Sequence, residues 1–231
     1  MTEPLRLACI DAEAPPLFSR SPDGVTRHGY EPDAAALVAE VMGRPLRWVF
    51  MPWAEFVPSL QAHEVDAVWC GQGITEERLR HVDFTRPYAV FNEAVLVRRG
   101  AGITSPSGLR GLRVAAIEGS TNMALAETFE GAATVPFGGE TDDVFGDMLA
   151  ALRSGEVDAV VDDDVVFVPL AEDADFDLAF TVPTANRWGV AVAKDRPGTR
   201  SALDDALATV IGDGRLRRIW NTWMPTLPFP L

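Results

Sequence analysis

The chain has 231 residues, 47% of them hydrophobic and 23% charged, and its formal net charge at pH 7 is −14. These values are typical of a folded chain with one large or two small domains, and they exclude an intrinsically disordered protein. The negative charge argues against nucleic acid and anionic membrane surfaces as partners, and no apolar run approaches the roughly 20 residues that span a bilayer.

The first part of the chain alternates predicted strands and helices. The strands are expected at Leu5–Ile10, Leu46–Phe50 and Ala67–Cys70, and the helices at Pro32–Gly43 and Pro52–His63. A β-α-β-α-β order predicts a parallel sheet, and parallel sheets bind ligands at the carboxyl ends of their strands.

The stretch Asp66–Tyr88 carries the strongest local signal. A buried strand ends at the glycines Gly71 and Gly73, and Thr75 can then cap the start of a helix that contains Arg78. Exposed backbone amides beside a guanidinium form a pocket for a carboxylate. The stretch alone is equally consistent with an ordinary strand, turn and helix that carries a surface arginine.

After this stretch the pattern restarts. Strands are predicted at Ala94–Val97, Leu112–Ile117, Thr134–Phe137, Val157–Val161, Leu178–Thr181 and Trp188–Ala193. Helices are predicted from Thr121 to about Glu130, and at Asp142–Arg153, Val165–Ala171, Ser201–Ile211 and Arg215–Trp223.

A nine-residue pattern occurs twice. The segment Leu60–Val68 has the sequence LQAHEVDAV, and Leu152–Val160 has the sequence LRSGEVDAV. Both copies end a predicted helix and enter a predicted strand. Two copies are too few for a solenoid, but they fit two similar α/β lobes. The first copy leads to Gly71–Arg78 and the second to Asp162–Asp164, so an arginine and an acid would be available for a zwitterion.

The two cysteines, Cys9 and Cys70, have neither the spacing of a metal site nor that of a disulfide framework. Both fall at the ends of predicted buried strands, so we expect two buried free thiols, and the sequence leaves open a bridge if the strands are neighbours. No export signal precedes the first strand, which predicts either a mature exported protein with a new start or a protein that stays inside the cell.

Several short motifs occur in order along nearly the whole chain. They include Gly29-Tyr30-Glu31-Pro32-Asp33, Gly73-Ile74-Thr75-Glu76-Glu77-Arg78, Val82-Asp83-Phe84-Thr85-Arg86-Pro87-Tyr88, Gly119-Ser120-Thr121 and Gly212-Asp213-Gly214. In this order and spacing they resemble the type 2 periplasmic solute-binding proteins, specifically the amino-acid-binding group (bacterial extracellular solute-binding family 3). The resemblance implies an α/β fold of two lobes joined by a two-strand hinge, with a central ligand cleft that closes on the ligand. Lobe one would contain 1–88 and 189–231, and lobe two 89–188.

The same resemblance implies how the ligand is held. Its carboxylate would bind the guanidinium of Arg78 and the amides of Gly73 and Thr121. Its ammonium group would bind the carbonyl of Gly71 and the carboxylate of Asp163. Because Asp163 has an aspartate on each side, Asp162 remains the alternative.

Two further residues would contact the ligand's side chain. Trp53 would stack on it, and Asp11 would reach a cationic group. Trp53 could equally belong to the core, and Asp11 could equally cap a helix. The family's usual aromatic residue is missing at Ala14, which widens one wall of the pocket. The three histidines are expected at the surface, and neither a metal nor a cofactor is expected, because Asp162–Asp164 lacks the glycine and distal glutamate of a calcium loop.

Three functions follow, in decreasing order of preference. The first is a monomeric, non-catalytic protein that binds an amino acid or similar small zwitterion for the membrane subunits of an ABC importer, in the periplasm or at the cell surface if a signal peptide was removed. The second is an enzyme resembling cyclohexadienyl (arogenate or prephenate) dehydratases, with Asp163 or Glu118 as a general acid whose pKa is raised by burial. The third is the sensory module of a receptor. The ligand's identity does not follow from the sequence.

Overall fold

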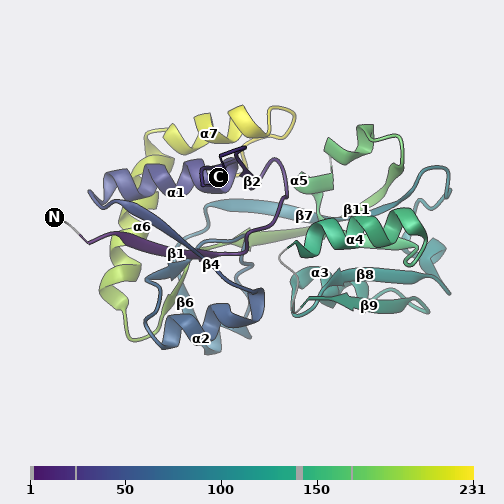
Figure 1. Ribbon diagram of the computed structural model, residues 1–231, viewed down its shortest axis with the longest axis horizontal. Helices are drawn as coiled ribbons and strands as arrows, with labels where there is room; N and C mark the ends of the chain where they lie inside the picture. Colours follow the sequence, from purple (N-terminus) through teal and green to yellow (C-terminus); the bar gives the residue numbers. More distant parts are fainter. Residues whose placement is uncertain (1–2, 24, 139–142, 168) are drawn as a thin grey trace. The chain divides into compact units, whose positions relative to one another are not determined.

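The computed structural model describes residues 3–23, 25–138, 143–167 and 169–231. The chain forms two compact units: unit 1 contains Met1–Asp11, Leu17–Val90 and Asn186–Leu231, and unit 2 contains Ala12–Pro16 and Phe91–Ala185. Each unit has its own five-stranded sheet and its own helices (Figure 1). The fold is therefore α/β in two lobes, as the sequence predicts.

The sheet of unit 1 has the strand order β4-β1-β5-β12-β6. Its parallel strands are β1 (Leu5–Cys9), β4 (Leu46–Phe50) and β5 (Ala67–Val68), and β12 (Ala191–Ala193) pairs antiparallel with β5 and with β6 (Val82–Phe84). Because β1, β4 and β5 are parallel, the loops after their last residues leave the sheet at the same edge.

The helices of unit 1 cover this sheet. They are α1 (Tyr30–Val41), α2 (Phe56–Gln61), α6 (Pro197–Gly212) and α7 (Arg215–Trp223). Helix α1 packs against α6 and α7 (Figure 1), and its first turn carries acidic residues, which the positive end of the helix dipole favours. Smaller elements complete the unit: the two-stranded sheet of β2 (Ser19–Arg20) and β3 (Arg27–His28), and the 3₁₀ turns η1 (Trp53–Glu55) and η2 (Arg78–Arg80).

The sheet of unit 2 has the order β11-β7-β10-β8-β9. Its strands are β7 (Ala89–Arg98), β8 (Arg113–Ile117), β9 (Ala133–Phe137), β10 (Ala159–Asp163) and β11 (Phe176–Trp188). Its helices are α3 (Thr121–Ala126), α4 (Val144–Ser154) and α5 (Asp164–Phe167). It also contains the 3₁₀ turns η3 (Pro106–Leu109) and η4 (Pro169–Glu172). Alternate residues of three strands pack with α3: Val95 and Val97, Val114 and Ala116, Ala159 and Val161. The residues between them, such as Leu96 and Val160, are also fully buried. Residues on both faces of these strands are therefore buried, as expected for a sheet that contains the parallel strands β8, β9 and β10.

The repeated nine-residue pattern has the same structural role in both units. Asp66, just before β5, accepts hydrogen bonds from the backbone amide and the guanidinium of Arg6 on β1, at 3.0 and 2.8 Å. Asp158, just before β10, accepts the same pair of bonds from Arg113 on β8, both at 3.0 Å. Each aspartate thus ties the start of its strand to the start of the neighbouring parallel strand. The bonds from Arg113 lower the pKa of Asp158 well below its usual range.

Several predicted elements differ from the structure. The helix expected after Thr75 is only the short turn η2, because the neighbouring backbone bonds to other chain segments instead: the Ile74 amide donates to the Arg187 carbonyl at 2.8 Å. The strand predicted at Ala94–Val97 is part of the longer β7, and Leu178–Thr181 is part of the longer β11. The expected start of a helix at Asp142 lies outside the described residues.

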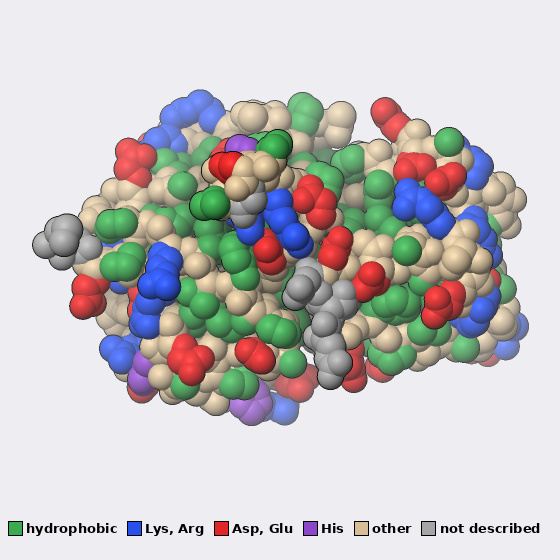
Figure 2. Space-filling view, viewed as in Figure 1, with side chains coloured by type: hydrophobic (Ala, Val, Ile, Leu, Met, Phe, Trp, Pro, Cys, Tyr) green, Lys and Arg blue, Asp and Glu red, His purple; other side chains and the backbone are tan. Residues whose placement is uncertain are grey.

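Arginine and acidic side chains are interspersed over the visible surface (Figure 2). Many are within ion-pair distance, for example Arg86 and Asp204 at 2.8 Å in unit 1 and Arg110 and Glu130 at 2.7 Å in unit 2. Such exposed pairs stabilise a fold by only about 0–1 kcal/mol each. In the described ranges, none of the helices has the length and apolar character required to cross a membrane.

Candidate ligand-binding residues

Arg78 is the first residue of η2, and several contacts fix its side chain. Its backbone amide donates to the Thr75 hydroxyl at 3.2 Å, but the residue that precedes this turn is Glu77, and the helix predicted to begin at Thr75 does not form. Its guanidinium donates to the Gly73 carbonyl at 2.9 Å and lies 5.3 Å from the centre of the Trp53 ring. A carbonyl at one side and an aromatic face together define the plane of the guanidinium.

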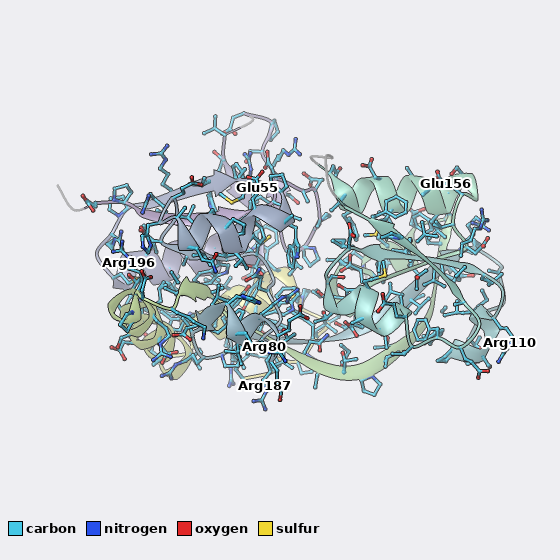
Figure 3. All side chains as sticks on the ribbon, turned by 90° about the horizontal axis from the view of Figure 1, so that it is seen from below. Glu55, Arg80, Arg110, Glu156, Arg187 and Arg196 are labelled. Atoms are coloured by element: carbon cyan, nitrogen blue, oxygen red, sulfur yellow. The ribbon has the colours of Figure 1, made fainter. Side chains whose placement is uncertain are left out.

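The neighbouring Arg80 provides a contrast within the same turn. The side chain of Arg80, which is labelled in Figure 3, is exposed, whereas the side chain of Arg78 is half-buried. Trp53 is also half-buried, at the start of η1, and its ring lies 5.2 Å from the ring of Phe56, whose side chain belongs to the core. Trp53 therefore packs on the core with one part and on Arg78 with another, and its stacking on a ligand's side chain stays a prediction.

The glycines before Arg78 lie against aromatic rings of unit 1. Gly71 has φ +57°, and a Cβ atom there would lie 3.1–3.2 Å from the indole of Trp188. Its amide donates to the hydroxyl of Tyr88 at 3.1 Å. Gly73 is buried and forms an isolated antiparallel bridge with Trp188. Glycine at position 71 therefore permits both the backbone conformation and the close approach of Trp188.

A buried acid lies behind this loop. Glu31, on the first turn of α1, is 3% exposed, and it accepts hydrogen bonds from the hydroxyl of Tyr88 at 2.9 and 3.1 Å. Burial raises the pKa of Glu31 from 4.5 to about 8, although Tyr88, Trp69 and the Gly71 amide lower it. Glu31 was not among the predicted site residues. Its place in the motif Gly29-Tyr30-Glu31 was the sequence feature that could have identified Glu31 as a candidate.

Asp11 is already paired within unit 1. Both of its carboxylate oxygens accept from Arg27, at 2.9 Å from Nε and 3.0 Å from Nη2. Arg20 adds a longer ionic contact of 3.6 Å. The side chain of Arg27 is only 6% exposed, and its guanidinium lies over the ring of Phe50. A cationic ligand group would therefore compete with an ordered, buried arginine for this carboxylate.

In unit 2 the predicted acid Asp163 belongs to a buried cluster of carboxyl groups. Asp163 and Asp162 end β10 and are each 9% exposed, and Glu93, opposite Asp163 on β7, is 2% exposed. The Asn122 side chain donates to Asp163 at 3.3 Å, and the Asp163 amide donates to the Asp162 carboxylate at 2.7 Å. Exposure alone does not distinguish Asp162 from Asp163.

The cluster has an unusual charge state. Burial raises the pKa of Asp162 to about 7, and the charge of Glu93 acts in the same direction. Burial, followed by the charges of Asp162 and Glu93, raises the pKa of Asp163 well above its usual range. Buried groups of like charge favour either a bound proton or a bound cation. Within the described ranges, no group of three or more His, Cys, Asp or Glu side chains is arranged to hold a metal ion.

Thr121 is the first residue of α3, and Ser120 caps this helix by accepting a hydrogen bond from the Met123 amide at 3.0 Å. Within unit 2, Thr121 therefore directly precedes Asn122, which contacts Asp163. Within unit 1, Arg78 contacts both Gly73 and Trp53. The sequence did not identify Arg27, Tyr88 or Glu93 as contributors, because their partners are distant in the chain, whereas Asp162 was named as the alternative to Asp163.

Comparison with known proteins identifies the class. The sequence model of the bacterial extracellular solute-binding proteins, family 3, matches residues 7–226, and this chain belongs to that family. The predicted resemblance is thereby confirmed.

Individual relatives cover most of the chain. The ABC transporter glutamine-binding protein GlnH of Bacillus subtilis (strain 168) is 29% identical over 74% of this chain and 62% of its own length, so this alignment leaves over a third of GlnH unmatched. An L-arginine-binding protein of Pseudomonas aeruginosa is 28% identical over 96% of this chain and 88% of its own. Among solved structures, an ancestral arginine-binding protein bound to arginine is similar, with a TM-score of 0.87, 28% identity and coverage of 97% of this chain and 99% of that one.

Proposed function

We propose that this protein binds a free amino acid and delivers it to the membrane subunits of an ABC importer. Family membership and the glutamine- and arginine-binding relatives support this function. The observation that carries the proposal is the geometry of Arg78, whose guanidinium is oriented by the Gly73 carbonyl and the Trp53 ring. An oriented guanidinium binds a carboxylate through two parallel hydrogen bonds, which specifies the ligand's geometry.

The acids of unit 2 provide the complementary charge. Asp163 binds the ligand's ammonium group, and the negative charges of the neighbouring Asp162 and Glu93 also attract it. A cation that enters a buried group of carboxyls replaces the protons they otherwise retain, so the region remains close to neutral. In unit 1, the Gly73 amide and the Gly71 carbonyl, and in unit 2 the Thr121 amide, add backbone hydrogen bonds to the same two ligand groups.

The contacts of Asp11 support a ligand with an uncharged side chain. Its carboxylate is engaged by Arg27, so a cationic side chain would have to displace an existing buried ion pair. A polar, uncharged side chain such as an amide can bind beside this pair without displacing it. Asp11 then acts together with Arg27 as a polar wall of the site.

The test is a calorimetric titration with each of the common amino acids, followed by variants. Arg78→Ala should weaken binding of the best ligand by about 10- to 150-fold, as expected for the loss of a charge-assisted bond of about 1.5–3 kcal/mol. Arg80→Ala is the matched control, because this exposed arginine lies in the same turn. Equal affinities of the two variants, or no binding of any amino acid by the wild type, would refute the proposal.

The proposal includes the absence of catalysis. The alternative enzyme needs a buried general acid, and Glu118 is exposed. Asp163 is buried, but a cation-binding role accounts for its environment equally well. Incubation with prephenate or arogenate and detection of the aromatic product separates the two functions, and we expect no turnover. We further propose that the protein acts outside the cytoplasmic membrane, which the family description supports, and that it acts as a monomer.

A further inference from the structure

The two cysteines are adjacent at one edge of the sheet in unit 1. Cys9 is the last residue of β1, and Cys70 lies two positions after the end of the neighbouring parallel strand β5. The thiol of Cys9 donates to the sulfur of Cys70 at a distance of 2.9 Å. The amide of Ile10 also donates to the sulfur of Cys70, at 3.4 Å. Both thiols are free, as expected, and the two strands are neighbours, which is the condition under which the sequence left a bridge open.

The two thiols differ in access to solvent. Cys9 is 2% exposed, whereas Cys70 is partly exposed. Burial raises the pKa of the Cys9 thiol, and the contact with Cys70 acts in the same direction. The thiolate is the reactive form of cysteine, and burial disfavours the thiolate of Cys9. An external reagent therefore reacts first with Cys70, which is partly exposed.

We propose that Cys9 and Cys70 form an intramolecular disulfide when the protein meets a low-molecular-weight disulfide. Bond formation requires the sulfur atoms to approach from 2.9 Å to about 2.05 Å, a movement of roughly 0.9 Å. Neighbouring strands allow such a movement without a rearrangement of the sheet. This inference does not depend on the identity of any ligand.

The reaction has two exchange steps. The Cys70 thiolate attacks the small disulfide, forms a mixed disulfide and releases one small thiol. Cys9 then loses its proton and attacks the Cys70 sulfur, which forms the protein disulfide and releases the second small thiol. The two cysteines are oxidised, the small disulfide receives the two electrons, and both protons end on the released thiols.

The crosslink would join two segments that are 61 positions apart in sequence. It would tie the end of β1, just before Asp11, to the residue before Gly71. Because a crosslink of this span restricts the unfolded chain, it stabilises the folded state if the native geometry is retained. We expect a rise in melting temperature of about 5–10 °C.

The experiment treats the folded wild-type protein with oxidised glutathione and measures its intact mass under denaturing conditions after alkylation of free thiols. We expect a mass lower than that of the reduced protein by two hydrogen atoms, with no alkylated cysteine. A product with two alkylated cysteines, a stable glutathione adduct, or a disulfide-linked dimer on a non-reducing gel would overturn the proposal.

Two matched variants test the order of the steps. Cys9→Ser should stop at a glutathione adduct on Cys70, because the resolving thiol is missing. Cys70→Ser should remain largely unmodified, because Cys9 is buried. Equal modification of both variants would overturn the assigned order, and the mass of the wild-type protein decides the main question even if one variant does not fold.

Discussion

The hydroxyl of Tyr88 donates a hydrogen bond of 2.9 Å to the buried carboxyl group of Glu31. The same hydroxyl accepts from the Gly71 amide at 3.1 Å. Tyr88 thereby connects an acid on α1 with the loop that leads to Arg78. Burial raises the pKa values of the nearby Cys9 and Tyr30, and the charge of Glu31, when it is ionised, acts in the same direction.

The first prediction concerns the pH dependence of stability. The pKa of Glu31 is about 8 in the folded protein, against an ordinary value of 4.5. Between these values the folded state holds a proton that the unfolded chain has released, so stability falls as pH rises through this window. The slope for one group is at most about 1.4 kcal/mol per pH unit. Glu31→Gln should remove this contribution, as measured by urea unfolding at a series of pH values.

The matched control for this prediction is Glu40→Gln, on the exposed side of the same helix. Burial also raises the pKa values of Asp162 and Asp163, which contribute a slope of the same sign in unit 2. The effect of Glu31 is therefore measured by the difference between each variant and the wild type in the pH slope of the free energy of unfolding. Identical pH slopes for Glu31→Gln and the wild type would contradict a protonated Glu31.

The second prediction concerns selectivity and rests on the proposed function. Arg27→Met keeps an apolar chain against Phe50 but removes the partner of Asp11. The released carboxylate should then attract a cationic side chain, so the affinity for arginine relative to glutamine should rise by about tenfold or more, as expected for one charge-assisted bond.

Calorimetric titration of both ligands measures this ratio. Arg20→Met is the control, since the ionic contact of Arg20 with the Asp11 carboxylate is longer, at 3.6 Å. It should change the ratio less than Arg27→Met does. An unchanged ratio in Arg27→Met would show that Asp11 does not face the ligand's side chain.

The third prediction compares the cost in stability of replacing the two glycines that flank α1. Gly29 precedes the helix with φ +126°, and a Cβ atom there would lie 2.3 Å from the carbonyl oxygen of Leu17. Gly43 follows the helix with φ +64°, and nothing lies within 4 Å of its added Cβ. Gly43→Ala should therefore cost only about 1 kcal/mol, from its backbone conformation.

Gly29→Ala should cost more, about 3 kcal/mol or above, because the backbone itself must move. This movement would displace Tyr30 and Glu31, which follow directly. The free energies of unfolding of the two variants, measured in urea, check the difference. If Gly29→Ala and Gly43→Ala lowered the free energy of unfolding by similar amounts, the backbone near Leu17 would be able to move away from the added Cβ atom without cost.

The sequence predicted those parts of the fold that depend on local patterns. The strand Leu46–Phe50 and the helix Arg215–Trp223 have the expected bounds, because each is a periodic segment between clear breaks. The repeated pattern also indicated two similar units, and its aspartates have equivalent bonds in both. The family was recognised from motifs that the family match confirms.

Other parts depend on contacts between distant segments. The Asp11–Arg27 pair was not predicted, because the sequence around Arg27, which forms the two-residue strand β3, has no periodic pattern. The bond between Glu31 and Tyr88 joins residues 57 positions apart, and no sequence rule connects them. The roles of Arg78, Asp163 and the other predicted contacts with a ligand remain predictions, which the variants described above can test.

The last prediction follows from the one position where the repeated pattern differs in backbone preference. Gly155 ends α4 with φ +81°, and His63 occupies the equivalent position after α2 with φ +58°. The hydrogen bonds around the two residues match: the Glu64 amide donates to the Ser59 carbonyl at 3.0 Å, and the Glu156 amide donates to the Ala151 carbonyl at 2.9 Å. Both helices therefore end in the same motif, in which glycine is the favoured residue.

His63→Gly should consequently raise the free energy of unfolding by about 0.5–1 kcal/mol, since it relieves a left-handed conformation. The substitution removes an exposed contact with Asp195 and one with Arg196, which is labelled in Figure 3, but exposed pairs of this kind contribute little. His63→Ala removes the same contacts and keeps the strain, so it should be less stable than His63→Gly. The opposite order in urea unfolding would mean that the contacts of His63 outweigh its backbone strain.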